Sequence, residues 1–305
     1  MIKILRQLGV GRLWWRIRQL PQTLSLWNIK ARWVKMRHLS SIIRAAPIPA
    51  GQGEVEIHML LHHKRVFEAL WALYSFVFLA GQPFRIVIHD DGSLTVADRQ
   101  LLQKVFPGVS FVGRIESDIA LENYFQEQGL HRCANMRRNL IFARKLFDPV
   151  FFSKSKWILL MDSDVLFYRK PLEVLQADNL YSCDNGYRYC LDENQMIELL
   201  GRPCIERFNP GIMKIQRKEV AFNQVESWLT HPGFWKKDGT GNYYAELTLW
   251  AMILTTADAT PLPDTYRICA PDPAQFTYGH YCGGGYWASL FYTRGILFLK
   301  QRLFS

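Results

Sequence analysis

The chain has 305 residues, of which 49% are hydrophobic, and this is enough to bury the core of one large α/β domain with or without an appendage. Of its 37 Lys and Arg, ten lie in residues 1–53, which hold no acid, so the other 27 balance the 27 acids. The net charge of +10 therefore belongs to the amino-terminal segment, and a body that is basic throughout is excluded.

The six cysteines form no C-x-x-C pair and no zinc-like grouping, which favours a reduced compartment. The amino terminus lacks the uninterrupted apolar core of a signal peptide. The most apolar stretch, residues 69–80, is shorter than the roughly 20 residues that a membrane span requires. We expect a cytoplasmic protein, either free or peripheral on the cytoplasmic face of a membrane.

Residues 1–46 combine these ten cations with four tryptophans, Trp14, Trp15, Trp27 and Trp33. Pro21 is predicted to separate two helices. Cations with interfacial aromatics favour an anionic membrane surface as a partner. The alternative is a pair of helices that pack on the body or on a partner and present a solvated basic face. Nucleic acid is disfavoured, because the segment matches no nucleic-acid-binding fold.

Residues 46–53, rich in Pro and Gly, are predicted to be a linker, which divides the chain into a basic helical extension (1–53) and one domain (54–305). From here the pattern alternates. Strands are predicted at 54–61, 84–89 and 110–112, and helices at 65–80 and 95–106. This order is typical of a doubly wound nucleotide-binding sheet. A further helix is predicted at 135–147, ended by Asp148-Pro149.

The most strand-like run of the chain, residues 157–161, leads directly into Asp162-Ser163-Asp164. An uninterrupted apolar run suits a strand buried on both faces, and its carboxyl end is where open α/β sheets bind ligands. Two acids one residue apart there can hold a hard divalent cation against a diphosphate. The alternative is an ordinary turn, because a strand-end Asp often caps one.

The remaining elements follow in order. Residues 208–215 are predicted to be a turn feeding a strand, 221–230 and 246–255 helices, and 261–268 extended. Residues 280–287 combine glycines with aromatics.

The order of D-D-G-S, I-L-L-M-D-S-D-V-L-F, F-N-P-G-I-M, A-E-L-T-L-W and H-Y-C-G-G-G, over roughly residues 54–290, resembles the nucleotide-sugar glycosyltransferases of the GT-A fold. The nearest likeness is to the glycogenin and galactosyltransferase-like group, family 8. The resemblance implies a GT-A-type, mostly parallel nucleotide-binding sheet flanked by helices, beside the basic helical amino-terminal extension. It also implies Mn²⁺ or Mg²⁺, a nucleoside-diphosphate-sugar donor, above all a UDP-sugar, and a saccharide or lipid-linked acceptor. Family 8 leans towards retention at the anomeric centre.

By this resemblance, Asp162 and Asp164 are metal ligands, with His280 as the third. Asp162 and Gly283 would lie at the donor diphosphate. The family's lysine in the last motif is absent, because Gly285-Tyr286 stands in its place, so a lysine contact from this loop is not expected. A tail histidine in a glycine loop without a ligand is the alternative for His280.

Lys145 falls where the family places a basic residue that touches the donor, although a solvated basic helix face would look the same. Asp90 and Asp91 resemble the segment that grips the nucleoside, and a tight turn with a helix cap is the alternative. Asn209 matches the turn that faces sugar and acceptor. Glu246 matches a catalytic acid near the transferred sugar, where it could act as a base or stabilise an oxocarbenium ion. An acid in the first turn of a helix is also favourable without any function.

Two other functions fit parts of the pattern. Haloacid-dehalogenase-like phosphatases also carry a strand running into D-x-D, but they need a downstream acidic cluster, and only Asp192-Glu193 is available. A non-catalytic basic protein, associated with a membrane or nucleic acid and retaining a degenerate nucleotide fold, would explain the charged extension alone.

Overall fold

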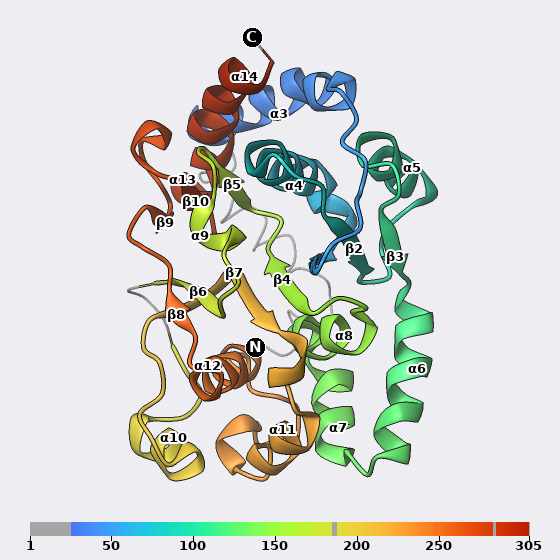
Figure 1. Ribbon diagram of the computed structural model, residues 1–305, viewed down its shortest axis with the longest axis vertical. Coiled ribbons are helices and arrows are strands. Elements are labelled where there is room, and N and C mark those ends of the chain that lie inside the picture. Colours follow the sequence, from blue (N-terminus) through green and yellow to red (C-terminus); the bar gives the residue numbers. More distant parts are fainter. Residues whose placement is uncertain (1–25, 185–187, 283–284, 305) are drawn as a thin grey trace, which may run out of the picture.

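The computed structural model describes residues 26–184, 188–282 and 285–304 (Figure 1). The predictions that concern Trp14, Trp15, Pro21 and Gly283 lie outside these residues. Within the described chain, the central sheet has seven strands in the order β3-β2-β1-β4-β7-β6-β8. Their bounds are β1 Val55–Leu61, β2 Arg85–Asp90, β3 Ser110–Val112, β4 Trp157–Met161, β6 Leu180–Cys183, β7 Phe208–Gln216 and β8 Thr260–Pro261.

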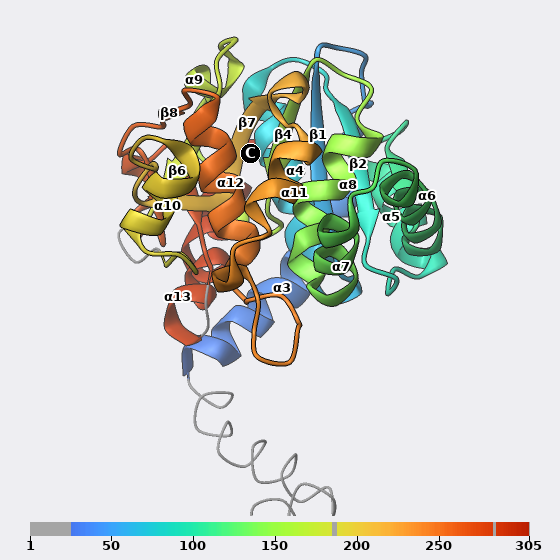
Figure 2. The ribbon, with the colours of Figure 1, turned by 90° about the horizontal axis from the view of Figure 1, so that it is seen from below.

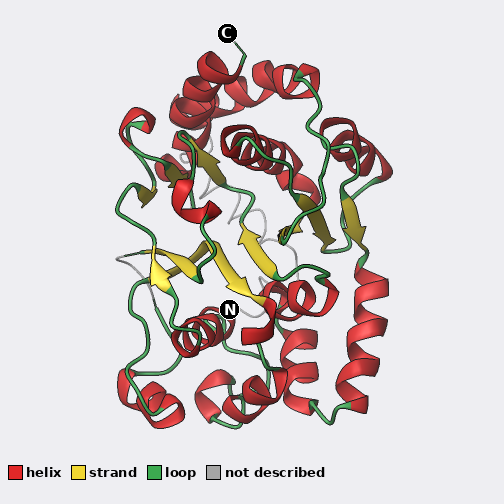
Figure 3. Ribbon diagram, viewed as in Figure 1, coloured by secondary structure: helices red, strands yellow, loops and turns green. Residues whose placement is uncertain are grey.

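Four of the six pairings in this sheet are parallel, and the two that involve β7 are antiparallel. Helices cover both faces (Figure 3), and the prediction of a mostly parallel α/β sheet flanked by helices is confirmed. The helices are α3 Leu26–Arg44, α4 Val66–Ala80, α5 Val96–Val105, α6 Arg114–Glu127, α7 His131–Asn139, α8 Arg144–Phe152, α9 Leu172–Leu175, α10 Glu193–Leu200, α11 Phe222–Trp228, α12 Ala245–Thr256, α13 Gly285–Leu290 and α14 Leu297–Leu303, with a π-helical segment, Phe291–Ile296, before the last.

Two hydrophobic cores lie on opposite faces of the sheet. Successive residues of β4 point to opposite sides, so that Leu159 and Met161 join the core under α4, while Ile158 and Leu160 join the core under α7, α8 and α12. Because β4 is buried on both faces, its residues read as a continuous apolar run.

A second, three-stranded sheet has the order β5-β10-β9, formed by Val165–Phe167, Tyr278–His280 and Tyr266–Ile268. Strand β5 follows β4 after the Asp162-Ser163-Asp164 segment, so the chain passes from one sheet to the other at these acids. Strand β10 pairs antiparallel with β5, and this pairing brings residues 278–280 next to the Asp162-Ser163-Asp164 segment.

Two predicted elements differ from the structure. The helix predicted at 135–147 is two helices, α7 and α8, because Leu140 is extended at φ −131° and ψ 108°. Asp148-Pro149 does not end it either, since α8 continues to Phe152 with Pro149 inside. Residues 208–215 lie in one continuous strand instead of a turn followed by a strand.

The amino-terminal helix α3 lies against the body beside α4, α5 and α13 (Figure 2). The linker that follows is tied to the body by two hydrogen bonds: Ile48 N–H donates to Val105 O, at the end of α5, at 2.9 Å, and Gly51 N–H donates to Phe84 O, just before β2, at 2.9 Å. No helix in the described part of the chain is both long and apolar enough to cross a membrane.

Candidate metal and donor site

Asp162 and Asp164 lie at the carboxyl end of β4, as predicted. The backbone fixes both: Asp162 N–H donates to Gly211 O at 2.9 Å, and Tyr281 N–H donates to Asp164 O at 2.9 Å. Neighbours in β7 and after β10 therefore hold this short segment from two sides. The acids sit at the point where the two sheets meet.

His280 is brought to the acids by strand pairing, because it lies opposite Val165 in the antiparallel pair β10–β5. Its Nε2 is 3.2 Å from Asp164 Oδ1 and 3.8 Å from Asp162 Oδ2. One ligand atom from each of the three residues lies within 4.8 Å of the other two, and no other such group of His, Cys, Asp or Glu occurs among the described residues. Two carboxylates and an imidazole form a donor set that suits Mn²⁺.

Asn209 holds the imidazole from behind. His280 Nδ1 lies 2.7 Å from Asn209 Oδ1, which can only accept, so Nδ1 carries a proton and Nε2 faces the acids. Burial lowers the pKa of His280, but the charges of Asp164 and Asp162 outweigh it and raise the pKa overall. Burial alone would raise the pKa of Asp164, but His280 lowers it more, to about 2. The ionised acids and the protonated histidine therefore stabilise each other.

Gly211 is the residue that lets His280 approach. A Cβ at this position would lie 2.4 Å from His280 Nδ1 and 2.5 Å from the Tyr278 hydroxyl, both far inside van der Waals contact. Gly211 N–H also donates to Asn209 Oδ1 at 2.9 Å. The Asn209-Pro210-Gly211 segment of β7 thus packs directly against the His280 ring.

Lys145 lies in the first turn of α8, and its Nζ forms an ion pair with Asp162 Oδ1. Burial would lower the pKa of Lys145, but Asp162 and then Glu246 raise it well above its ordinary value. The break at Leu140 begins a new helix just before Lys145 and turns this side chain into the site. The single helix predicted at 135–147 did not include this break, so it did not predict how Lys145 reaches the site.

Glu246 is buried in the first turn of α12, and its Oε1 has no hydrogen-bond partner among the described residues. Burial raises the pKa of Glu246 to about 7, with Asp162 adding to the shift and Lys145 opposing it. A buried carboxyl poised near neutrality is typical of a general acid or base.

Asp90 and Asp91 lie at the end of β2 and are largely engaged by their own loop. Asp90 accepts from Gly92 N–H at 2.7 Å and from Arg99 Nη2 at 2.6 Å. Asp91 Oδ1 accepts from the Ser93 hydroxyl at 2.6 Å, while its Oδ2 lies 3.9 Å from His62 Nε2. Asp91 therefore keeps more room for a ligand than Asp90 does.

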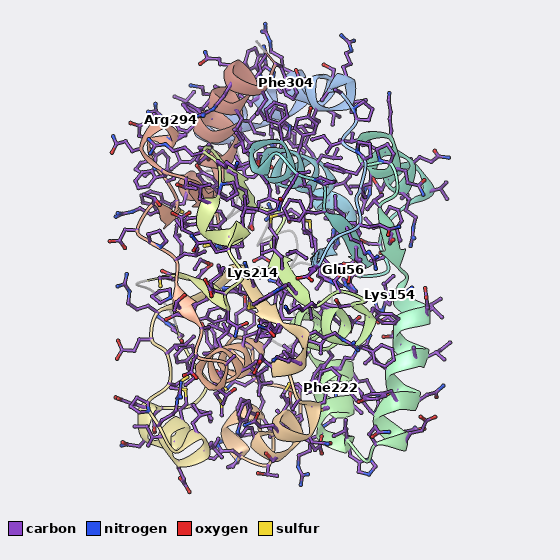
Figure 4. The ribbon with its side chains drawn as sticks, viewed as in Figure 1. Glu56, Lys154, Lys214, Phe222, Arg294 and Phe304 are labelled. Atoms are coloured by element: carbon purple, nitrogen blue, oxygen red, sulfur yellow. The ribbon has the colours of Figure 1, made fainter. Side chains whose placement is uncertain are left out.

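A buried polar group beside Lys145 and Asp162 is absent from the sequence predictions. His58 Nδ1 lies 2.8 Å from His89 Nε2, and both rings line a small cavity together with Lys145 and Asp162. His58 Nε2 lies 3.4 Å from Glu56 Oε2, which also accepts from Lys154 N–H at 2.9 Å; Glu56 and Lys154 are labelled in Figure 4. The available signal was an acid and a histidine at alternate positions of an otherwise apolar strand.

An open cleft lies next to this site, because Cys269 in its wall donates its N–H to His280 O at 2.7 Å. Its walls include Asp184, Arg207, Asp264, Cys269, Cys282 and Trp287. Asp184 joins it to the site, because Asn209 Nδ2 donates to Asp184 Oδ2 at 3.5 Å. Two lining residues, Arg207 and Cys269, have positive φ angles of 58° and 51°, an uncommon backbone state that clusters at functional sites.

No family model matches the chain, and no curated protein matches it. Among solved structures, the galactosyltransferase LgtC, in complex with donor and acceptor sugar analogs, aligns at 16% identity over 75% of this chain and 87% of its own, with a TM-score of 0.47. Mouse xyloside xylosyltransferase 1 in its apo form aligns at 14% identity over 77% and 98%, also at 0.47. The bifunctional WbbM aligns at 13% identity over 84% and 53%, at 0.48. Likeness at this level does not identify a function.

Proposed function

We propose that the chain is a metal-dependent glycosyltransferase of the GT-A type, similar to family 8. It would move a sugar from a nucleoside diphosphate, most simply a UDP-sugar, to a hydroxyl of a saccharide or lipid-linked acceptor. The observation that carries this proposal is the grouping of Asp162, Asp164 and His280 at the carboxyl end of β4. Lys145 pairs with Asp162, and the buried Glu246 is near enough to interact electrostatically with both.

Each residue has a role in this proposal. Asp162, Asp164 and His280 would hold Mn²⁺ or Mg²⁺, which when bound neutralises charge on the leaving diphosphate. Lys145 adds a fixed cation from the side of α8, and Asp91, with Asp90 shaping its loop, would accept from the nucleoside. Gly283 is proposed to lie at the diphosphate, by resemblance alone.

Glu246 and Asn209 would serve the reacting sugar. With a pKa near 7, Glu246 can take up the proton of an acceptor hydroxyl or, when charged, stabilise an oxocarbenium ion. Asn209 connects the metal-binding histidine to Asp184 in the cleft wall, so it would orient groups on both sides. The acceptor would enter through that cleft.

The alternative phosphatase gains no support from the site. Its downstream acids would be Asp192-Glu193, but Asp192 begins α10 as its cap, accepting from Gln195 N–H at 2.9 Å. These acids are not part of the grouping around Asp162. As partners, the proposal also includes an anionic membrane surface at residues 1–46, on the cytoplasmic face.

The test is hydrolysis of UDP- and GDP-sugars by the purified chain, with and without Mn²⁺. We expect one donor to be hydrolysed only with the cation, and Asp162→Asn to abolish this. Asp192→Asn is the matched control, because it makes the same change at a cap that Asn fills equally well. Metal-independent turnover, or full turnover by the Asp162 variant, would sink the proposal.

A further inference from the structure

Helix α3 has two apolar faces. One packs on the body through the buried residues Ala31, Val34, His38 and Ile42. The other consists of exposed side chains: Leu26 at 83%, Ile29 at 49%, Trp33 at 49% and Met36 at 72%. We call these four residues the α3 stripe. A helix that only covered the body would not need the α3 stripe, because its inner face already does the packing.

The α3 stripe is narrow and is bordered by cations. At 3.6 residues per turn its four members fall within about 80° of one another, nearly opposite the buried face. Lys30 and Arg37 follow on one side of it, and Arg32 on the other; all three are exposed. The Arg37 guanidinium lies 4.8 Å from the centre of the Trp33 ring. Apolar side chains between long cations are the arrangement of helices that lie in a membrane interface.

The carboxyl-terminal helices extend this surface. Helix α3 contacts α13 and the π-helical segment (Figure 2), and a groove between α3 and α14 is lined by Trp33, Arg37 and Lys300. Arg294, at the outside of the molecule in Figure 4, and Arg302 are also exposed. Neither residues 26–53 nor residues 273–305 contain an acid.

We propose that this surface, formed by α3, α13 and α14, docks on an anionic lipid bilayer. The α3 stripe enters the boundary between headgroups and acyl chains, and Arg37 and Lys300 contact headgroup phosphates. Charge complementarity favours lipid over another copy of the chain, because like-charged, acid-free surfaces repel each other. A surface with charges alone would be stable in solvent without a partner. Here, however, exposed apolar residues lie between the charges.

Docking in this way would also place the cleft at the bilayer, a consequence that rests on the proposed function. Trp287 lies on α13, is 52% exposed, and forms part of the cleft wall. An acceptor anchored in the bilayer would then reach the cleft beside Trp287, which favours the lipid-linked class over a free saccharide.

The experiment is cosedimentation of the full chain with vesicles of phosphatidylcholine, alone or mixed with phosphatidylglycerol. We expect binding only to the anionic mixture, weakening as salt rises. Replacing Lys30, Arg32 and Arg37 together by Gln should weaken it on the order of 100-fold, at roughly fivefold per charge. Changing Ile29, Trp33 and Met36 together to Ser should weaken it at least about tenfold.

Two control variants match these changes elsewhere on the surface. Lys104, Lys236 and Lys237 changed to Gln remove the same charge, and Val96→Ser with Ile115→Ser removes exposed apolar side chains from α5 and α6. Both controls should bind as the unchanged chain does. Donor hydrolysis in solution should be the same in all variants, so docking and the proposed function can fail separately.

Three outcomes would overturn the proposal. The first is stripe variants that bind vesicles like the unchanged chain. The second is binding that deletion of residues 1–25 abolishes while the stripe variants retain it. The third is a chain that self-associates through the α3 stripe in ultracentrifugation and does not bind vesicles.

Discussion

Strands β2 and β4 flank β1 as its parallel neighbours, and both end in acids, yet the two ends do different things. At the end of β2, Asp90 accepts from Gly92 and Leu94 N–H groups of its own loop and from Arg99 of the following helix. At the end of β4, Asp162 pairs with Lys145 of the preceding helix α8, and Asp164 pairs with His280, which comes from β10 of the other sheet. Acids with local partners organise a turn, whereas acids with distant partners form a site.

The largest expected effect separates the two strand ends by activity. Asp162→Asn or Asp164→Asn should lower metal-dependent donor hydrolysis about a thousandfold, since several kcal/mol of charge stabilisation are lost. Asp90→Asn should lower it far less. Circular dichroism should show all three variants folded. Equal losses at both strand ends would remove the distinction.

The next effect concerns the charge gathered at β4. Because the pKa of Glu246 is raised to about 7 from 4.5, the folded chain keeps a proton there that the unfolded chain releases. Stability therefore falls as the pH rises through this window, by about 3 kcal/mol in total. In EDTA, Glu246→Gln should be more stable than the unchanged chain by about this amount at pH 8.

Urea unfolding between pH 5 and 8 measures this difference. The advantage of Glu246→Gln should shrink as the pH falls, because the unchanged chain then carries a neutral carboxyl as well. Glu193→Gln, at an exposed position in α10, is the control and should show no such trend. An advantage that stays constant with pH would contradict the assigned cause.

A third prediction tests how closely the distant partners must fit. Gly211→Ala places a methyl group against His280 and should weaken Mn²⁺ binding about 10- to 100-fold, because the imidazole is displaced. Gly53→Ala is the control, since a Cβ there meets nothing within 4 Å. Titration calorimetry with Mn²⁺ distinguishes them, and equal affinities would show that the close approach is dispensable.

The smallest effect belongs to the end of β2. Asp90→Asn should lower the free energy of unfolding by about 1–2 kcal/mol, because the Arg99 pair, which is partly exposed, loses its charge. Asp91→Asn should lower the free energy of unfolding by less, because the Oδ1 of an asparagine can still accept the hydrogen bonds from Ser93. Urea unfolding at pH 7 measures both, and the reverse order would mean that Asp91 is the organising residue.

The sequence predicted what depends on a local pattern. The apolar run 157–161 leading into two acids located β4 and its carboxyl end, and the alternation before it located β1, α4, β2, α5 and β3. His280 is different, because the sequence pattern does not reveal the pairing of β5 with β10 that brings it to Asp164. Only the family resemblance pointed to it, and the structure supplies the distance.

What the sequence missed depends on tertiary contacts. Leu140 has no Gly or Pro beside it, yet its extended conformation separates α7 from the segment that leads into α8, where Lys145 meets Asp162. The buried pair His58–His89 lies across two strands, so neither strand reveals it alone. Asn209-Pro210-Gly211 looks like a turn because its composition is usual for turns, yet here it bonds within a sheet.

The ion pair between Lys145 and Asp162, and that between His280 and Asp164, carry one more consequence. The two acids are already balanced by two basic side chains of the same chain, so folding does not have to wait for a cation. This differs from small zinc domains, which unfold when their ion is withdrawn. A chelator should therefore abolish donor hydrolysis while leaving the melting temperature nearly unchanged. Adding Mn²⁺ back should restore the activity without refolding.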